Sequence, residues 1–170
     1  MEMAAAAMLL TLPGLPCIYT GQEVGEEFEP YKTTGPISWE DRHRLRDYYK
    51  KLIWLRRRVA SLHSRRWEIL EARGSEQAYA YARYGAAGEA PALVVLNFSP
   101  EEARVEVSLS EELQRNGRSK LLPYDLLRDE RVVIEDCGAG RIRVPMPGFS
   151  ARIFMVARGG ESVPIWGPRR

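Results

Sequence analysis

The fold of this chain is decided by residues 12–25, which read LPGLPCIYTGQEVG. Turn-forming prolines and glycines open the stretch, and two glycines bracket its polar end. Between them lies the short apolar run Cys17-Ile18-Tyr19. A few β-forming residues between turn residues are typical of a short strand, and an apolar run without alternation is typical of a strand covered on both faces. We therefore expect a buried strand in a parallel arrangement, either a barrel or a doubly wound sheet.

Helices are expected on both sides of this strand. Residues 2–10 consist mainly of Ala, Met and Leu, which are strong helix formers, and they are apolar almost all round. Ser38 is a capping residue, and after it apolar residues recur every three or four positions as far as Leu62. The polar residues of the stretch thus come after the strand, at the end where ligands sit in parallel α/β folds.

The N-terminal residues also have the Ala- and Leu-rich texture of a secretory signal that precedes a cysteine. However, Glu2 stands where a signal has a basic residue, and Pro16 stands directly before Cys17, where processing requires a small residue. The pattern therefore favours a helix that leads into the strand.

This stretch resembles the eighth barrel strand of the α-amylase family of glycoside hydrolases, whose pattern is roughly Gly-x-Pro-x-Ile-Tyr-x-Gly-(Asp/Gln)-Glu. The positions that match it are Gly14, Pro16, Ile18, Tyr19, Gly21, Gln22 and Glu23. The rest of the chain is similar to the family's remaining C-terminal elements, namely a last barrel helix and an all-β C-terminal domain. The resemblance covers only the end of the family's architecture, because a complete barrel of about 250 residues does not fit into 170.

From Trp67 onward, short β-rich runs alternate with turn signals. The expected strands are residues 67–72, 77–84, 92–97, 104–109, 120–124, 132–135, 141–145 and 151–157. Many short strands at this spacing favour an antiparallel sandwich, in which the continuous apolar run 93–96 is central. We therefore expect an α+β chain: a helix–strand–helix remnant of a TIM barrel (residues 1–64), a β-sandwich (65–158) and a tail (159–170).

Charge and composition argue against several classes of partner. The 25 basic and 23 acidic residues give a net charge of +2, which is too balanced to indicate a nucleic acid or an anionic membrane. The arginines 56–58 fan around a helix axis and suit a solvated last turn better than a phosphate-binding stripe. The longest apolar runs also fall short of the ~20 residues of a membrane span.

The cysteines and histidines give no sign of a metal site, a disulfide framework or a cofactor. Cys17 and Cys137 stand far apart and are expected to be reduced thiols. His43 and His63 have no clustered partners, so neither a metal nor a cofactor is predicted. A serine-hydrolase elbow and a glycine-rich phosphate loop are also missing from the sequence.

The resemblance implies chemistry whose central residues lie elsewhere. In the family, one ionised carboxylate attacks the anomeric carbon and a protonated one assists the leaving group, about 5–5.5 Å apart in the retaining geometry. These groups, with a third carboxylate, come from the fourth, fifth and seventh barrel strands, upstream of the matched stretch. The resemblance therefore implies no catalytic residue in this chain, and it leaves Gln22 and Glu23 either to brace the strand end or to form the rim of the substrate cleft.

We therefore expect the C-terminal part of a glycosidase or glucanotransferase whose ligand is an α-glucan or oligosaccharide, with this chain alone inactive. The alternative is a stand-alone carbohydrate-binding or accessory module, in which Tyr79 and Tyr81 share a strand face and form a platform for a pyranose ring. A purely structural interaction protein is the third interpretation. Because barrel elements without neighbours leave apolar surface bare, we also expect residues 1–25 to self-associate or to be disordered. Substrate preference and localisation stay open.

Overall fold

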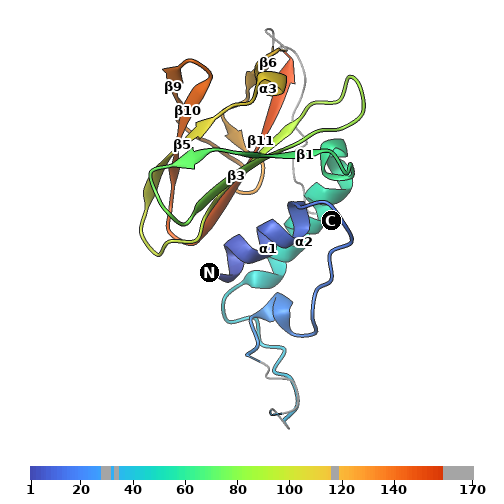
Figure 1. The fold of residues 1–170 in the computed structure, drawn as a ribbon. Helices are drawn as coiled ribbons and strands as arrows, with labels where there is room; N and C mark the ends of the chain where they lie inside the picture. Colours follow the sequence, from blue (N-terminus) through green and yellow to red (C-terminus); the bar gives the residue numbers. More distant parts are fainter. Residues whose placement is uncertain (28–31, 33–34, 116–118, 159–170) are drawn as a thin grey trace.

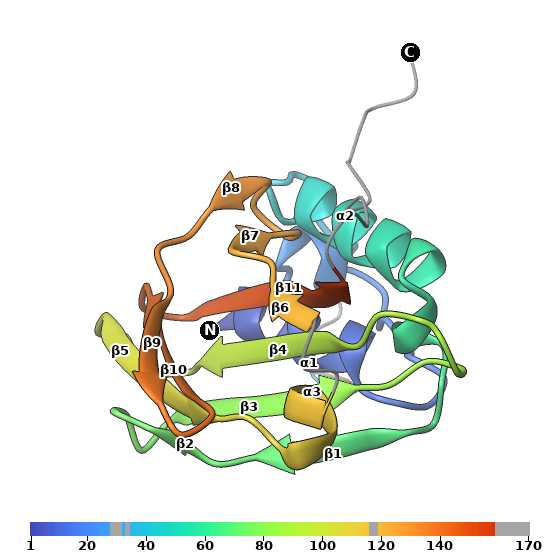
Figure 2. The same cartoon turned by 90° about the horizontal axis from the view of Figure 1, so that it is seen from above.

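The computed structural model describes residues 1–27, 32, 35–115 and 119–158. Its elements form three layers, which are a pair of helices, a five-stranded sheet and a four-stranded sheet (Figures 1 and 2). The expected α+β class with antiparallel sheets is confirmed. The expected tail, residues 159–170, lies outside the described residues.

The five-stranded sheet is the middle layer of the molecule. Its strands, in spatial order, are β1 (Trp67–Leu70), β3 (Ala78–Arg83), β4 (Ala92–Asn97), β11 (Ser150–Arg158) and β6 (Ser119–Leu121). All neighbouring strands in it are antiparallel. Strand β4 is buried on both faces, because Val94 and Leu96 meet the helices while Leu93 and Val95 face the second sheet. The expectation that this run is central is confirmed.

The four-stranded sheet closes the sandwich. Its strands, in order, are β2 (Ala72–Arg73), β5 (Ala103–Ser108), β10 (Arg141–Met146) and β9 (Glu135–Gly138), and a separate pair is formed by β7 (Tyr124–Asp125) and β8 (Glu130–Arg131). The single strand expected over residues 67–72 is therefore wrong, because the chain leaves one sheet after Leu70 and joins the other at Ala72. Helix α3 (Glu111–Arg115) was not expected.

Helix α2 (Leu45–Arg58) begins later than Ser38, where the sequence pattern predicted its start. The carboxylate of Asp41 accepts hydrogen bonds from the backbone N–H groups of Leu45 at 2.8 Å and Arg46 at 3.2 Å. These N–H groups have no partner within the helix, so Asp41 takes the capping role that was assigned to Ser38. The helical pattern then continues past Arg58 as the short 3₁₀ helix η2 (Ala60–Leu62).

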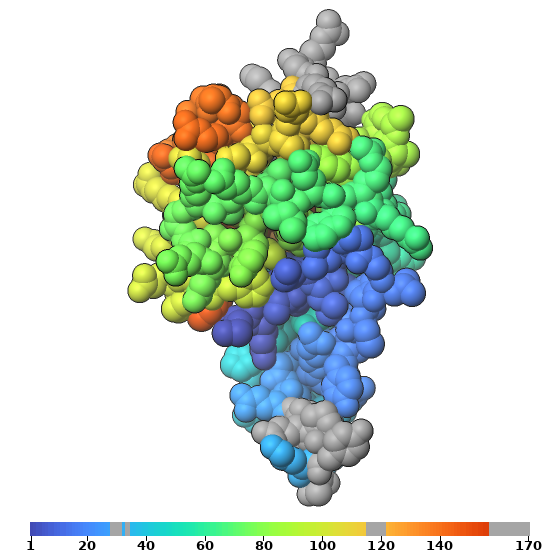
Figure 3. All heavy atoms as spheres, viewed as in Figure 1, coloured from blue at the N-terminus to red at the C-terminus, as the bar shows by residue number. Residues whose placement is uncertain are grey.

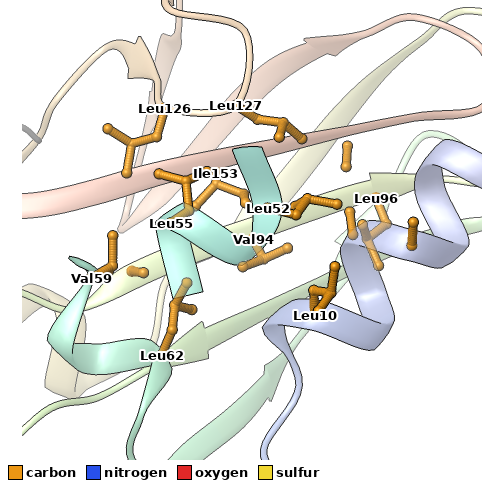
Figure 4. Packing of buried hydrophobic residues seen from close by; sticks show 14 of the residues in the cluster. Leu10, Leu52, Leu55, Val59, Leu62, Val94, Leu96, Leu126, Leu127 and Ile153 are labelled. Atoms are coloured by element: carbon orange, nitrogen blue, oxygen red, sulfur yellow. The ribbon is translucent and has the colours of Figure 1, made fainter. Parts of the chain in front are cut away.

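Two apolar cores lie on opposite faces of the five-stranded sheet. One fills the sandwich, and the other joins the sheet to α2 and α1 (Glu2–Thr11). In the second core, side chains of both helices point at β4 and β11, with Leu10 and Leu52 among them (Figure 4). The helix predicted over residues 2–10 thus forms as α1, and it packs against apolar side chains of α2 and the sheet.

The strand expected at Cys17–Tyr19 does not form. Residues 15–19 are neither helix nor strand, and no strand pairs with them in the described part of the chain. A strand is defined by its hydrogen-bond ladder, so an isolated apolar run cannot make one however well its residues suit it. Each described strand pairs within the sheets formed by residues 67–158, so the partners of this run are not among them.

Candidate functional site at the Leu12–Gly25 stretch

The polar end of the stretch folds into a tight turn between the two helices. Gln22 and Glu23 lie in the 3₁₀ helix η1 (Gln22–Val24), which ends at Gly25 with a φ of 71°. A side chain at Gly25 would come within 3.1 Å of Glu2 Oε2 and 3.0 Å of Leu45 Cδ1. Glycine suits this position because the backbone is left-handed and the starts of α1 and α2 approach closely.

Gln22 closes the turn onto the apolar run. Its Oε1 accepts a hydrogen bond from the Tyr19 backbone N–H at 3.1 Å, and its own N–H donates to the Tyr19 carbonyl at 3.0 Å. The Gln22 side chain also bonds the hydroxyl of Tyr49 on α2. Burial raises the pKa of Tyr49, this hydrogen bond lowers it, and the carboxylates of Glu2 and Glu23 raise it further. The turn is therefore fixed both to the run before it and to α2.

Glu23 points one carboxylate oxygen into the protein. Its Oε2 is buried and has no hydrogen-bond partner among the described residues. A buried carboxylate oxygen without a donor is unfavourable, so this oxygen marks a position at which a donor is wanted. Glu23 therefore has one acceptor atom that is directed into the protein and is unsatisfied among the described residues.

Asp125 is the one acidic residue that is fully buried among the described residues. Asp125 is the one described carboxyl group whose pKa is raised, and burial is the main cause. It is held inside the molecule by the backbone N–H groups of Leu127 and Ile153 and by Arg152 at 3.2 Å. The carboxylate of Asp125 therefore connects parts of the fold to one another. In the sequence it is about 100 positions away from η1.

The polar loop after the turn reaches away from the sheets. Described parts of residues 20–44 project from the helix layer on the side opposite the sandwich (Figures 1 and 3). Glu26 ties the two ends of this loop together, because its Oε1 accepts a hydrogen bond from the Ser38 N–H at 3.2 Å. Residues 28–31 and 33–34 of the expected cleft rim lie outside the described residues.

The two tyrosines expected to form a sugar platform lie in different environments. Both lie on the helix-facing side of β3, but Tyr81 is only 3% exposed and its hydroxyl lies 2.5 Å from Thr11 Oγ1 of α1. Its ring also meets Trp67 edge-on at 6.1 Å. The assignment of Tyr81 to an exposed platform is wrong because α1 covers that part of the sheet. Tyr79 is 51% exposed beside Phe98, with the ring centroids 5.7 Å apart.

A hollow at one end of the sandwich was not anticipated from the sequence. It has a volume of about 690 Å³ and brings Arg66 and Glu68 together with Tyr84 and the start of α3. Its polar groups satisfy one another: the Tyr84 hydroxyl donates to Glu68 at 2.7 Å, and Arg66 pairs with Glu112 at 2.6 Å. Three segments that are far apart in the sequence form this hollow, so no local sequence motif predicts it.

Within the described ranges, no group of three or more His, Cys, Asp or Glu side chains is arranged to hold a metal ion. None of the described helices is long and apolar enough to cross a membrane.

Comparisons with known proteins establish the fold. No protein-family model and no curated protein sequence matches the chain. Among solved structures, Ttha1563 from Thermus thermophilus is 30% identical with a TM-score of 0.69, over 92% of this chain and 31% of that chain. The maltogenic α-amylase AmyB from Thermotoga neapolitana is 20% identical with a TM-score of 0.69, over 91% of this chain and 36% of that chain.

A cyclomaltodextrinase is similar as well, with 22% identity and a TM-score of 0.69 over 90% of this chain and 25% of that chain. This chain therefore spans between a quarter and about a third of the length of these solved structures. Two other matching structures involve sugar ligands, namely AmyP in complex with maltotriose and the acarbose-soaked debranching enzyme of Nostoc punctiforme.

Proposed function

Since this chain has the fold of the C-terminal part of α-amylase-family enzymes, we propose that it serves as that part of a glycoside hydrolase acting on α-glucosidic bonds. One observation carries the proposal. The matched stretch at residues 12–25 precedes a helix and a sandwich, which is the order that the family resemblance implies, and the fold match covers 92% of this chain and 35% of an α-amylase. The ligand of the complete enzyme would be an α-glucan or oligosaccharide.

In this proposal the chain divides into two working parts. Residues 1–64 supply the last helix, strand segment and helix of a barrel, and residues 65–158 form the sandwich that covers α1 and α2. Gln22 and Glu23 brace the strand end rather than react. The hydrogen bond from Tyr19 N–H to Gln22 supports the bracing role, and the inward-pointing Glu23 oxygen fits a donor supplied by a neighbouring barrel segment.

This chain alone is proposed to be inactive, because the resemblance places the catalytic carboxylates upstream. The purified chain should release no reducing sugar from soluble starch or maltoheptaose above a blank. Turnover that disappears in Glu23→Gln, but persists in Glu102→Gln on the surface of the sandwich, would overturn the proposal.

The DNA upstream of the Met1 codon gives a second, independent test. An open frame that continues upstream and carries Asp, Glu and Asp at the ends of predicted strands would support the proposal. A stop codon and a ribosome-binding site directly ahead of Met1 would contradict it and would favour a separate accessory protein.

The alternative, a carbohydrate-binding module, now depends on Tyr79 alone. Its half-exposed ring beside Phe98 is the observation that favours this alternative, since a pyranose ring stacks on an exposed aromatic face. Saturable binding of maltoheptaose that is lost in Tyr79→Ala, but kept in Ile69→Ala on the neighbouring strand, would support the module. Equal binding by both variants would count against it.

We further propose that the isolated chain self-associates through its N-terminal segment. Leu15 is 99% exposed, Met1 70% and Tyr19 55%, so the N-terminal segment leaves several large apolar side chains in solvent. A complete barrel would cover these residues, and in its absence a second copy of the chain is the available cover.

A further inference from the structure

Arg83 is the largest fully buried side chain of the described residues, and a carboxylate is not among its described hydrogen-bond partners. It comes from β3, in the middle layer. Its guanidinium donates to three backbone carbonyls: those of Thr11 at the end of α1, Leu62 at the end of η2, at 3.1 Å, and Ser64. Its Nε–H finds no partner within the described part of the chain.

The physical reason for this arrangement lies in the ends of helices. The last carbonyls of a helix lack intrahelical partners and carry partial negative charge, so a cation placed there is stabilised. Burial lowers the pKa of Arg83, as does the nearby charge of Arg56, but a guanidinium stays protonated in proteins. If the carbonyls moved away, a buried charge would lose its acceptors, which is strongly unfavourable.

The same end of α1 is held from its other side by α2. Arg56 donates to the carbonyls of Leu10 at 2.8 Å, Leu12 at 3.0 Å and Gly14 at 2.5 Å. The Tyr81 hydroxyl bonds Thr11 Oγ1, two residues before Arg83 on the same strand. The start of the 12–25 stretch is thus fixed between one arginine from the helix layer and one from the sandwich.

We propose that Arg83 is the positioning residue through which the β-sandwich sets the end of α1 and, with it, the start of the 12–25 stretch. Through its hydrogen bonds Arg83 joins three segments: β3, the end of α1 and the connection after α2. Removing it frees the N-terminal segment while the sandwich stays folded. The inference goes beyond the proposed function, because it concerns contacts within this chain and holds whether or not the chain is part of a glycosidase.

Amide hydrogen exchange on the full chain tests this inference. The variants are Arg83→Met, Arg83→Lys and, as a matched control, Arg152→Met, which removes the other arginine that is buried among the described residues. Arg152 is 7% exposed and is held by Asp125, Glu130 and the Pro145 carbonyl inside the sandwich. In Arg83→Met, amides of residues 8–22 should exchange roughly tenfold faster or more, while those of β4 change far less.

The lysine variant separates positioning from general destabilisation. Arg83→Lys keeps the charge and can still reach one carbonyl, so it should restore part of the protection of residues 8–22. Arg152→Met should lower protection around β7, β8 and β11 without selectively opening residues 8–22. If Arg83→Met does not fold, the lysine variant decides alone.

Three results would overturn the proposal. In the first, residues 8–22 exchange like unstructured peptide in the unchanged chain. In the second, the Arg83→Met change accelerates amide exchange in residues 8–22 and in β4 equally, or accelerates it in neither. Arg83→Lys takes the place of Arg83→Met in this comparison if it alone folds. In the third, Arg152→Met opens residues 8–22 as much as Arg83→Met does.

Discussion

The hydroxyl of Tyr81 is closed off from solvent between β3 and α1, and this has a consequence at high pH. Burial raises the pKa of Tyr81 to about 12, from its usual value of 10.0 in solvent. An acid whose pKa is higher in the folded state adds stability that is fully present below the unfolded pKa and is lost as the pH rises through the folded pKa. The loss amounts to about 1.4 kcal/mol for each pH unit between the two values.

Chemical unfolding at pH 9 to 12 measures this effect. The free energy of unfolding should fall more steeply above pH 10 in the unchanged chain than in Tyr81→Phe, which has no proton to lose. At neutral pH the variant should lose about 0.5–1.5 kcal/mol, because Thr11 Oγ1 keeps its bond to the Ala7 carbonyl at 2.6 Å. Parallel pH profiles would show that the hydroxyl is not confined as described.

Asp125 and Glu130 both bind Arg152, but from different environments. The Asp125 side chain has no exposed surface, whereas that of Glu130 is 46% exposed. Asp125→Ala should lower the free energy of unfolding by about 3–5 kcal/mol, since it removes a buried partner of a buried charge and the acceptor of two backbone N–H groups. Glu130→Ala should lower it by about 0–1 kcal/mol. Urea titration of both variants checks this, and similar losses would contradict the assignment.

At the scale of elements, the start of α2 depends on one side chain that lies outside the helix. Asp41→Ala should lower the free energy of unfolding by about 0.5–2 kcal/mol, because two N–H groups at the helix start lose their acceptor. Asp47→Ala is the matched control, since its side chain is 86% exposed and pairs with Lys50 on the surface. Thermal unfolding should separate the two variants, and a Ser38→Ala change should have little effect on helix content.

Helix α1 and residues 15–19 show how far local patterns reach. The residues of α1 favour a helix by their own propensities, and a helix satisfies its backbone within itself. The run Cys17–Tyr19 favours a strand equally well, but a strand satisfies its backbone only against another strand. Helix α1 was therefore predicted correctly. The run Cys17–Tyr19 has the composition of a strand, but no strand pairs with it among the described residues.

At the scale of the whole molecule, the exposed N-terminal residues predict self-association. Sedimentation velocity at increasing concentration should show species larger than a monomer, since each large apolar side chain left in water forfeits roughly 1.5–3 kcal/mol. The double change Leu15→Ser and Tyr19→Ser should shift the population toward monomer. Val133→Ser, at an 82% exposed apolar residue of the sandwich, should not. A monomer at all concentrations, with a protease-resistant N-terminus, would contradict the proposal.

The sequence by itself determined the features that depend on neighbours along the chain. These are the α+β class, the central β4, helix α1 and the motif at residues 12–25. Propensity, alternation and turn residues act over a few positions, so they can be read directly.

Only the tertiary structure decided which side chains are covered and by what. The buried hydroxyl of Tyr81 bonds Thr11, which is 70 positions away in the sequence, and the guanidinium of Arg83 donates to the Thr11 carbonyl, which is 72 positions away. Likewise, the hollow beside Arg66 arises because separate segments converge there. Such contacts depend on how the layers pack, and burial energies act between residues that meet in space, whatever their separation in sequence.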